Sequence, residues 1–188
     1  MVIFIGVCNK IEKAYKNGHL ICICLNRIDW QRRVIGYVKK FAKSDSFTLE
    51  VIDEFGQKKD LRTVSLSSIK SLEIGGVYIE NLEKLNKNGF KRTKTRPKYI
   101  SINKRNAHKK LNEFMALSTL CTFVFGTEYS VGIVTASTES EFSISNVGFD
   151  GSDNGFSVFD VNSLTQIRYE GNAEERISFL HKLANALP

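Results

Sequence analysis

The sequence repeats itself at an almost constant spacing, and this feature constrains the possible fold more than any other. The strand-like run 34–38 is matched by 130–134, which lies 96 residues further on, and each run carries one glycine. Segments 46–49, 68–72 and 76–85 are matched by segments 95 residues later. The offset changes from 96 to 95 only once, which corresponds to the deletion of one residue in the second copy. The pattern therefore predicts two diverged copies of one small module.

Each copy is expected to begin with an amphipathic helix, continue through five short strands and end in a second helix. Apolar residues at the i, i+4, i+7, i+8 spacing of a helical stripe open both copies: Val7, Ile11, Ala14 and Tyr15, then Ala107, Leu111, Phe114 and Met115. The strands are expected at 20–27, 33–42, 46–53, 61–66 and 68–74, and at 119–125, 129–137, 141–147, 155–160 and 163–169. Asn172 followed by Glu175 indicates a capping pair at the start of the last helix.

The predicted fold class is α+β, with two tandem small barrels that each have an N-terminal helix and five short antiparallel strands. The first module is placed at residues 1–86, a basic connector at 87–103 and the second module at 104–188. A module of about 80 residues buries only about 60% of the surface of its unfolded chain. Pairing of the copies, or oligomerisation, is therefore expected to cover the strand edges.

This order of elements resembles the Sm-like fold of the Sm and LSm proteins and of the bacterial Sm-like RNA chaperones. Gly36, Val38 and Leu49 match the glycine, aliphatic and leucine positions of the first motif of that family. In the second copy, Gly132 and Val134 match the first two of these positions. The resemblance implies a small barrel in each module, and an SH3-like barrel would explain the same apolar pattern.

The polar positions of the family's motifs are not retained. Its Asp and Asn positions are occupied by Ala42 and Ser46 in the first copy and by Thr138 and Phe142 in the second. The turns Ile74-Gly75-Gly76 and Tyr169-Glu170-Gly171 lack the arginine of the second motif. The resemblance therefore concerns the framework and does not extend to the residues that read RNA.

Charge is unevenly distributed along the chain, whose net charge is +7. Residues 1–110 hold 24 Lys/Arg and 10 Asp/Glu, whereas residues 111–188 hold 3 and 10. The segment 84–110 contains eleven basic residues and no acidic one. A block of this kind either stays solvated or meets a polyanion.

We interpret this basic segment as the candidate nucleic-acid-binding site, because phosphate neutralisation needs several cations and aromatic rings can stack on bases. The residues expected to contact phosphates are Lys91, Arg92, Lys94, Arg96, Lys98, Lys104, Arg105, Lys109 and Lys110, and those expected to stack are Phe90 and Tyr99. The alternative is a solvated linker, or a segment that lies on the acidic second module.

Two other patterns receive a structural interpretation. The run Asp150-Gly-Ser-Asp-Asn-Gly155 loosely follows the start of a calcium loop, but Val161 stands where a bidentate Glu is needed, so a hairpin turn is predicted. Cys22 and Cys24 lie in an apolar run that is typical of a buried strand rather than a zinc site. Neither a metal nor a cofactor is expected.

The leading functional hypothesis is a non-enzymatic nucleic-acid-binding protein, with RNA as the favoured ligand, which uses the first module and the connector. The chain has no nucleophile motif and no phosphate-binding glycine loop, so it is not expected to be an enzyme. The alternative is a protein-interaction or adaptor module that assembles with a protein partner or a second copy through strand edges and charge complementarity. A third hypothesis is an enzyme or regulator that binds a small ligand between the modules.

The expected location is the cytoplasm, without a membrane partner. The apolar N-terminal run ends at Asn9-Lys10, too early for a signal peptide, and no other run approaches the roughly 18 residues of a membrane span.

Overall fold

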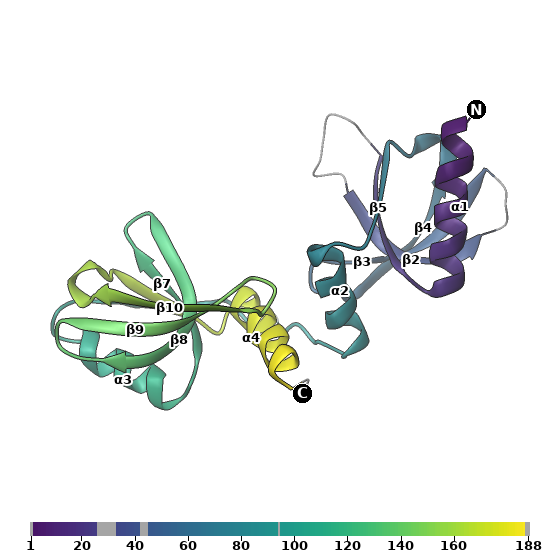
Figure 1. Ribbon diagram of the computed structural model, residues 1–188. Coiled ribbons are helices and arrows are strands. Elements are labelled where there is room, and N and C mark those ends of the chain that lie inside the picture. Colours follow the sequence, from purple (N-terminus) through teal and green to yellow (C-terminus); the bar gives the residue numbers. More distant parts are fainter. Residues whose placement is uncertain (1, 26–32, 42–44, 94, 187–188) are drawn as a thin grey trace. The chain divides into compact units, whose positions relative to one another are not determined.

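The computed structural model describes residues 2–25, 33–41, 45–93 and 95–186 (Figure 1). The chain forms two compact units, Met1–Lys91 and Arg92–Pro188. The described residues form four α-helices and two antiparallel sheets, which confirms the α+β class. In neither sheet do the two outermost strands pair with each other, so the expectation of closed barrels is wrong for the described residues.

Unit 1 consists of a five-stranded antiparallel sheet and two helices, in the strand order β4-β3-β2-β1-β5. Its elements are α1 (Val2–Asn17), β1 (Leu20–Cys24), β2 (Arg33–Phe41), β3 (Ser46–Ile52), β4 (Lys58–Ser65), a 3₁₀ turn (Leu66–Ser68), β5 (Ser71–Ile74) and α2 (Val77–Lys87). Helix α1 packs on β2 and α2 on β1 (Figure 1). Alternating side chains of these strands bury Ile21, Ile23, Phe47 and Leu49 beneath Ile11 of α1.

Unit 2 contains a six-stranded antiparallel sheet in the order β10-β9-β8-β7-β11-β6, with two helices. Its elements are β6 (Lys98–Ser101), α3 (Ala107–Ala116), β7 (Leu120–Phe125), β8 (Glu128–Ser137), β9 (Glu141–Val147), β10 (Asp153–Asp160), a 3₁₀ turn (Val161–Ser163), β11 (Gln166–Tyr169) and α4 (Asn172–Asn185). Phe123, Phe142 and Ile144 are fully buried at its centre, together with Leu111 of α3 and Ile167 of β11.

Strand β2 of unit 1 and strand β8 of unit 2 share the same two irregular features. Gly36 of β2 and Gly132 of β8 face backbone of the neighbouring strand so closely that neither position has room for a Cβ. Shortly after each glycine the ladder shifts register, between Val38 and Lys40 in β2 and between Val134 and Ala136 in β8. A glycine followed by a bulge increases the local twist and coiling of a strand.

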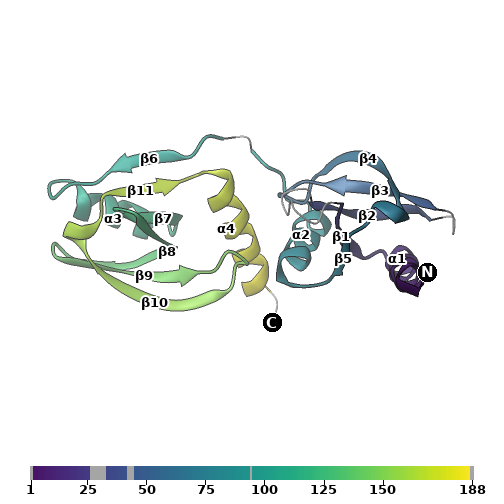
Figure 2. The same ribbon diagram turned by 90° about the horizontal axis from the view of Figure 1, so that it is seen from above.

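The segment 87–103 was expected to be a connector between modules, but most of it is part of unit 2. Residue Lys87 ends α2, whereas the residues from Arg92 onward belong to unit 2 and include β6, a strand that the sequence pattern did not indicate. Strand β6 lies beside β11 as the last strand of the sheet (Figure 2). Among the described helices, none has both the length and the apolar character needed to cross a membrane.

Candidate nucleic-acid interface

Most of the predicted phosphate-contacting residues lie on unit 2, around β6 and the start of α3. The exposed ones are Lys91, at the end of unit 1, and Arg92, Arg96, Lys98, Lys104, Arg105 and Lys109 of unit 2. Lys110 is half-buried, and Lys94 lies outside the described residues. The structure therefore places these cations along one folded segment rather than on a free linker.

Part of this positive charge is neutralised inside unit 2. The ammonium group of Lys98 lies 2.5 Å from a carboxylate oxygen of Glu170, and that of Lys110 lies 2.6 Å from Glu113. The hydrogen bond to Glu170 raises the pKa of Lys98. The hydrogen bond from Lys110 lowers the pKa of Glu113. These pairs agree with the alternative in which the segment lies on the acidic second module.

Polar side chains also fix the start of the segment to the beginning of α4. With the amide oxygen of Asn172 turned toward it, Arg92 donates to this oxygen from Nε and Nη2, each at 3.1 Å. The Thr93 hydroxyl donates to the Glu175 carboxylate at 2.6 and 2.7 Å. Thr95 donates to the same carboxylate at 3.2 Å. The predicted capping role of Asn172 and Glu175 is wrong, because Gly171 is the N-cap and neither side chain caps the helix.

Lys104 and Arg105 lie in a hydrogen-bonded turn before α3. The side chain of Asn103 accepts hydrogen bonds from the backbone N–H groups of Arg105 and Asn106, at 2.9 and 3.2 Å. The side chain of Asn106 accepts from the N–H of Asn103 and donates to the carbonyl of Ser101. Lys104 is exposed in this turn, beside Arg105.

Within the described part of the chain, neither Lys104 nor Arg105 forms an ion pair, and the same holds for Arg96. Lys109 follows in the first turn of α3, which contains no acidic residue. Positive charge at a helix N-terminus is unfavourable by about 0.3–1 kcal/mol per residue, because the helix dipole is positive there. A bound anion would relieve this repulsion.

The two aromatic residues of the segment have different environments. Tyr99 is 56% exposed on β6, where a stacking residue was expected. Phe90 is 9% exposed, and its backbone N–H donates to the carbonyl of Leu85 at 2.9 Å. It therefore closes the C-terminus of α2, and its ring is not presented for stacking. The preceding Gly89, with φ of +70°, is a sequence signal for this helix end, since a hydrophobic residue often follows the C-terminal glycine.

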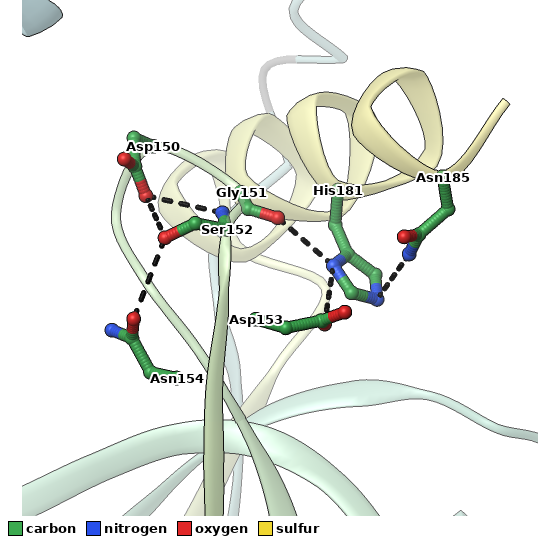
Figure 3. A network of polar contacts seen from close by, with 7 residues as sticks. All are labelled: Asp150, Gly151, Ser152, Asp153, Asn154, His181 and Asn185. Atoms are coloured by element: carbon green, nitrogen blue, oxygen red, sulfur yellow. Dashed lines mark hydrogen bonds and ion pairs between the residues drawn. The ribbon is translucent and has the colours of Figure 1, made fainter. Parts of the chain in front are cut away.

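The predicted hairpin turn is present between β9 and β10, where residues 148–152 join the strands, and Asp153–Gly155 already belong to β10 (Figure 3). One carboxylate oxygen of Asp150 accepts from the backbone and the hydroxyl of Ser152, at 3.1 and 2.6 Å. The Nδ1 of His181, on α4, donates to the carbonyl of Gly151 at 2.9 Å and lies 3.6 Å from the Asp153 carboxylate. The turn thus attaches the hairpin to α4.

Acidic, histidine and cysteine side chains are not gathered into a metal-binding group of three or more anywhere in the described ranges. Cys22 and Cys24 are buried in β1, in agreement with the strand interpretation. Burial raises the pKa of Cys22, and it raises that of Cys121 to about 12, so these thiols stay protonated at neutral pH.

Comparison of the chain with protein-family models, with curated proteins and with solved structures found no match.

Proposed function

We propose that the chain is a non-enzymatic, cytoplasmic nucleic-acid-binding protein, with single-stranded RNA as the favoured ligand. The observation that carries this proposal is the exposed set Arg96, Lys104, Arg105 and Lys109, none of which forms an ion pair with another described residue. These cations extend from the residues just before β6 to the start of α3, and the exposed ring of Tyr99 lies on β6. Phosphates would bind the cations and a base would stack on the ring.

We also propose that the units are two Sm-like modules derived by duplication. Supporting this, unit 1 has the order helix, four strands, 3₁₀ turn, strand and helix, and unit 2 has the same order after β6. The glycine and the bulge also recur at matching positions. An SH3-like relationship would have the same strand succession. Because the polar motif residues of the Sm-like family are replaced, we expect RNA to be bound through charge and stacking rather than through base edges.

The test is the salt dependence of binding to a fluorescein-labelled single-stranded RNA of about 16 nucleotides, the upper site size of an OB-fold. We expect the affinity measured by fluorescence anisotropy to fall steeply between about 50 and 200 mM salt. The triple variant K104A/R105A/K109A should bind more weakly, and its log–log salt slope should be smaller by about 2, since each phosphate contact on a single strand contributes about 0.7.

The matched control is the charge-conserving variant K104R/R105K/K109R, which should bind like the wild type. A single-stranded DNA of the same sequence should also bind, because no contact to the ribose hydroxyl is invoked. Affinity that does not change with salt, or a triple variant that binds like the wild type, would refute the proposal.

A second candidate function is protein interaction through strand edges, with the adaptor module assembling on a second copy or a partner. It is favoured by β10, which pairs only with β9 among the described strands. Phe156 and Val158 of this strand are 78% and 55% exposed. An exposed apolar edge strand is a ready template for pairing with another chain.

Light scattering after size-exclusion chromatography separates this candidate from the first. If β10 mediates assembly, the wild type should be an oligomer that is free of co-purified nucleic acid, and F156K/V158K should be monomeric, because edge lysines block strand pairing. The matched control is L117K, which changes an equally exposed apolar residue after α3 and should leave the mass unchanged. A monomeric wild type would exclude assembly of copies through this edge.

A further inference from the structure

In unit 2, the outer edge of β11 is covered by β6, a strand from the segment that precedes α3. Strand β6 pairs antiparallel with β11, so that Ile100 lies opposite Ile167 and Lys98 opposite Tyr169 (Figure 2). The side chain of Ile100 packs against the core that contains Ile167 and Phe114. Unit 2 thus shows how a short extended segment can fill the space between the last strand and the first helix of such a module.

The same space in unit 1 is open. Strand β5 takes the place of β11, but it pairs only with β1, and no described strand covers its other edge. Leu72, the counterpart of the fully buried Ile167, is half-buried, and Ile74 is 42% exposed. Ala14 on α1 occupies the position that corresponds to Phe114 on α3. The ring of Phe114 contacts the ring of Tyr169, with 4.9 Å between the two centroids.

A cavity of about 720 Å³ lies along this uncovered edge, between β5 and α1. It is lined by Leu72–Gly76 on the β5 side and by Lys10, Lys13, Ala14 and His19 on the α1 side. Leu72 and Ile74 supply an apolar surface, and the free edge of β5 supplies backbone donors and acceptors. We name this site the β5 groove.

The charged residues of the β5 groove favour an acidic ligand. Lys10 and Lys13 are exposed one turn apart on α1, and neither is in an ion pair among the residues described. The one carboxylate of the groove, Glu73, lies 3.5 Å from the guanidinium of Arg33 and is thereby partly neutralised. A phosphate backbone would satisfy the lysines, but it would leave the β5 edge and the apolar surface without partners.

We propose that the β5 groove binds an extended acidic segment of a partner protein, which adds to the sheet as a strand antiparallel to β5. The ligand would place an apolar side chain opposite Leu72, as Ile100 is placed opposite Ile167, and acidic side chains near Lys10 and Lys13. Strand addition draws affinity from the main chain and specificity from alternate side chains. This proposal rests on the second candidate function and is independent of nucleic-acid binding.

The experiment uses the full chain and a synthetic peptide with the β6 core, Glu-Glu-Tyr-Ile-Ser-Ile-Asp-Glu. Binding is measured by isothermal titration, and the bound site by changes in the amide NMR signals of Ser71–Ile74. We expect saturable binding that shifts these signals. The variant K10E/K13E should bind at least about tenfold more weakly, a loss of about 1.4 kcal/mol.

Two matched controls isolate charge and position. The variant K16E/K84E makes the same change in net charge outside the groove and should bind the peptide like the wild type. A peptide with the same core and lysines in place of its acidic residues should bind at least about tenfold more weakly than the acidic one. Failure of the acidic peptide to bind, or equal binding by K10E/K13E, would overturn the proposal.

Other occupants give different results. If the wild type is oligomeric and K10E/K13E is monomeric, a second copy occupies the groove and the proposal is wrong. If K10E/K13E loses RNA affinity but retains the peptide, the groove is a nucleic-acid site and the proposal is also wrong. If the peptide fails while F156K/V158K still dissociates an oligomer, only the β5 groove is refuted and assembly through β10 stands.

Discussion

At the scale of single residues, Gly36 and Gly132 allow neighbouring strands to approach more closely than any side chain permits. A Cβ on Gly36 would lie 2.2 Å from the carbonyl oxygen of Glu50, and a Cβ on Gly132 would lie 2.3 Å from that of Ser145. Since the obstacle is backbone, β3 would have to move. We expect Gly36→Ala to lower the free energy of unfolding of unit 1 by about 1–3 kcal/mol, measured by denaturant titration.

The matched control is Gly6→Ala in α1, where an added Cβ meets nothing within 4 Å. Alanine is the better helix former by about 0.5–1 kcal/mol, so this variant should be unchanged or more stable. A comparable loss of stability in both variants would show that the close strand approach is not the cause.

Glu174 is a buried carboxylate whose ionised form is stabilised by specific donors. Its side chain is 3% exposed, and it accepts hydrogen bonds from Thr122 Oγ1 at 2.6 Å and from Arg168 Nε at 2.7 Å. Burial alone raises the pKa of Glu174, but these hydrogen bonds and the helix backbone outweigh it, so the pKa lies below its ordinary value. The ionised network therefore joins β7, β11 and α4.

This lowered pKa predicts acid sensitivity of unit 2. A carboxyl whose pKa is lower in the folded than in the unfolded state contributes stability above the unfolded value, near 4.5, and loses it as the pH falls through the folded value. Hydrogen exchange of the β7 and β11 amides should accelerate as the pH falls below about 5, beyond the intrinsic trend. Glu174→Gln should flatten this dependence and cost about 1–3 kcal/mol at neutral pH.

The control for this pH dependence is Glu141→Gln on the exposed face of β9, which should retain the wild-type profile. An unchanged profile in Glu174→Gln would assign the acid sensitivity to other carboxylates.

At the scale of elements, the sequence predicted those whose pattern is local. The α1 stripe and the alternation of Phe47 and Leu49 in β3 each repeat within one element, so the helices and ten of the strands were located to within a few residues. Strand β6 was missed because its four residues lie in a basic run, and only the uncovered edge of β11 makes them a strand. Whether Lys104 has an ion-pair partner likewise depends on which acidic residues the fold brings near it, and sequence spacing does not reveal this.

Neighbouring residues of β6 are expected to have different roles. Ile100 packs on the unit 2 core, so Ile100→Ala should lower the free energy of unfolding by about 1–2 kcal/mol, less than the 2–5 kcal/mol of a fully buried isoleucine. Tyr99→Ala should change stability by no more than about 0.5 kcal/mol. If a base stacks on Tyr99, the same variant should lose about 1–3 kcal/mol of RNA binding.

Thermal unfolding and the RNA anisotropy assay measure the two effects separately. A Tyr99→Ala variant that loses stability as Ile100→Ala does, or that binds RNA like the wild type, would contradict the assignment of Tyr99 to the interface.

At the scale of the whole molecule, the position of the boundary between units changes how the charge is understood. With the boundary after Lys91, unit 1 holds 16 basic and 10 acidic residues, and unit 2 holds 11 and 10. The strong polarity between residues 1–110 and 111–188 is therefore mostly a polarity within unit 2, between its β6–α3 end and the rest. Charge attraction between whole units is therefore a weaker explanation for assembly. The cations are instead concentrated at one end of unit 2, which favours binding of a polyanion.

The same boundary predicts which fragment folds. The residues Arg92, Thr93 and Thr95 bind the start of α4, and β6 covers the edge of β11, so a fragment 92–188 should keep all these contacts. A fragment 104–188, cut where the sequence pattern placed the module, would leave β11 as an open edge. Its Tm should be lower than that of 92–188 by at least about 4–8 °C, the shift that 1 kcal/mol produces in a domain of this size. Equal melting temperatures would mean that β6 adds no stability to unit 2. The assignment of residues 92–103 to unit 2 rather than to a free connector would then be wrong.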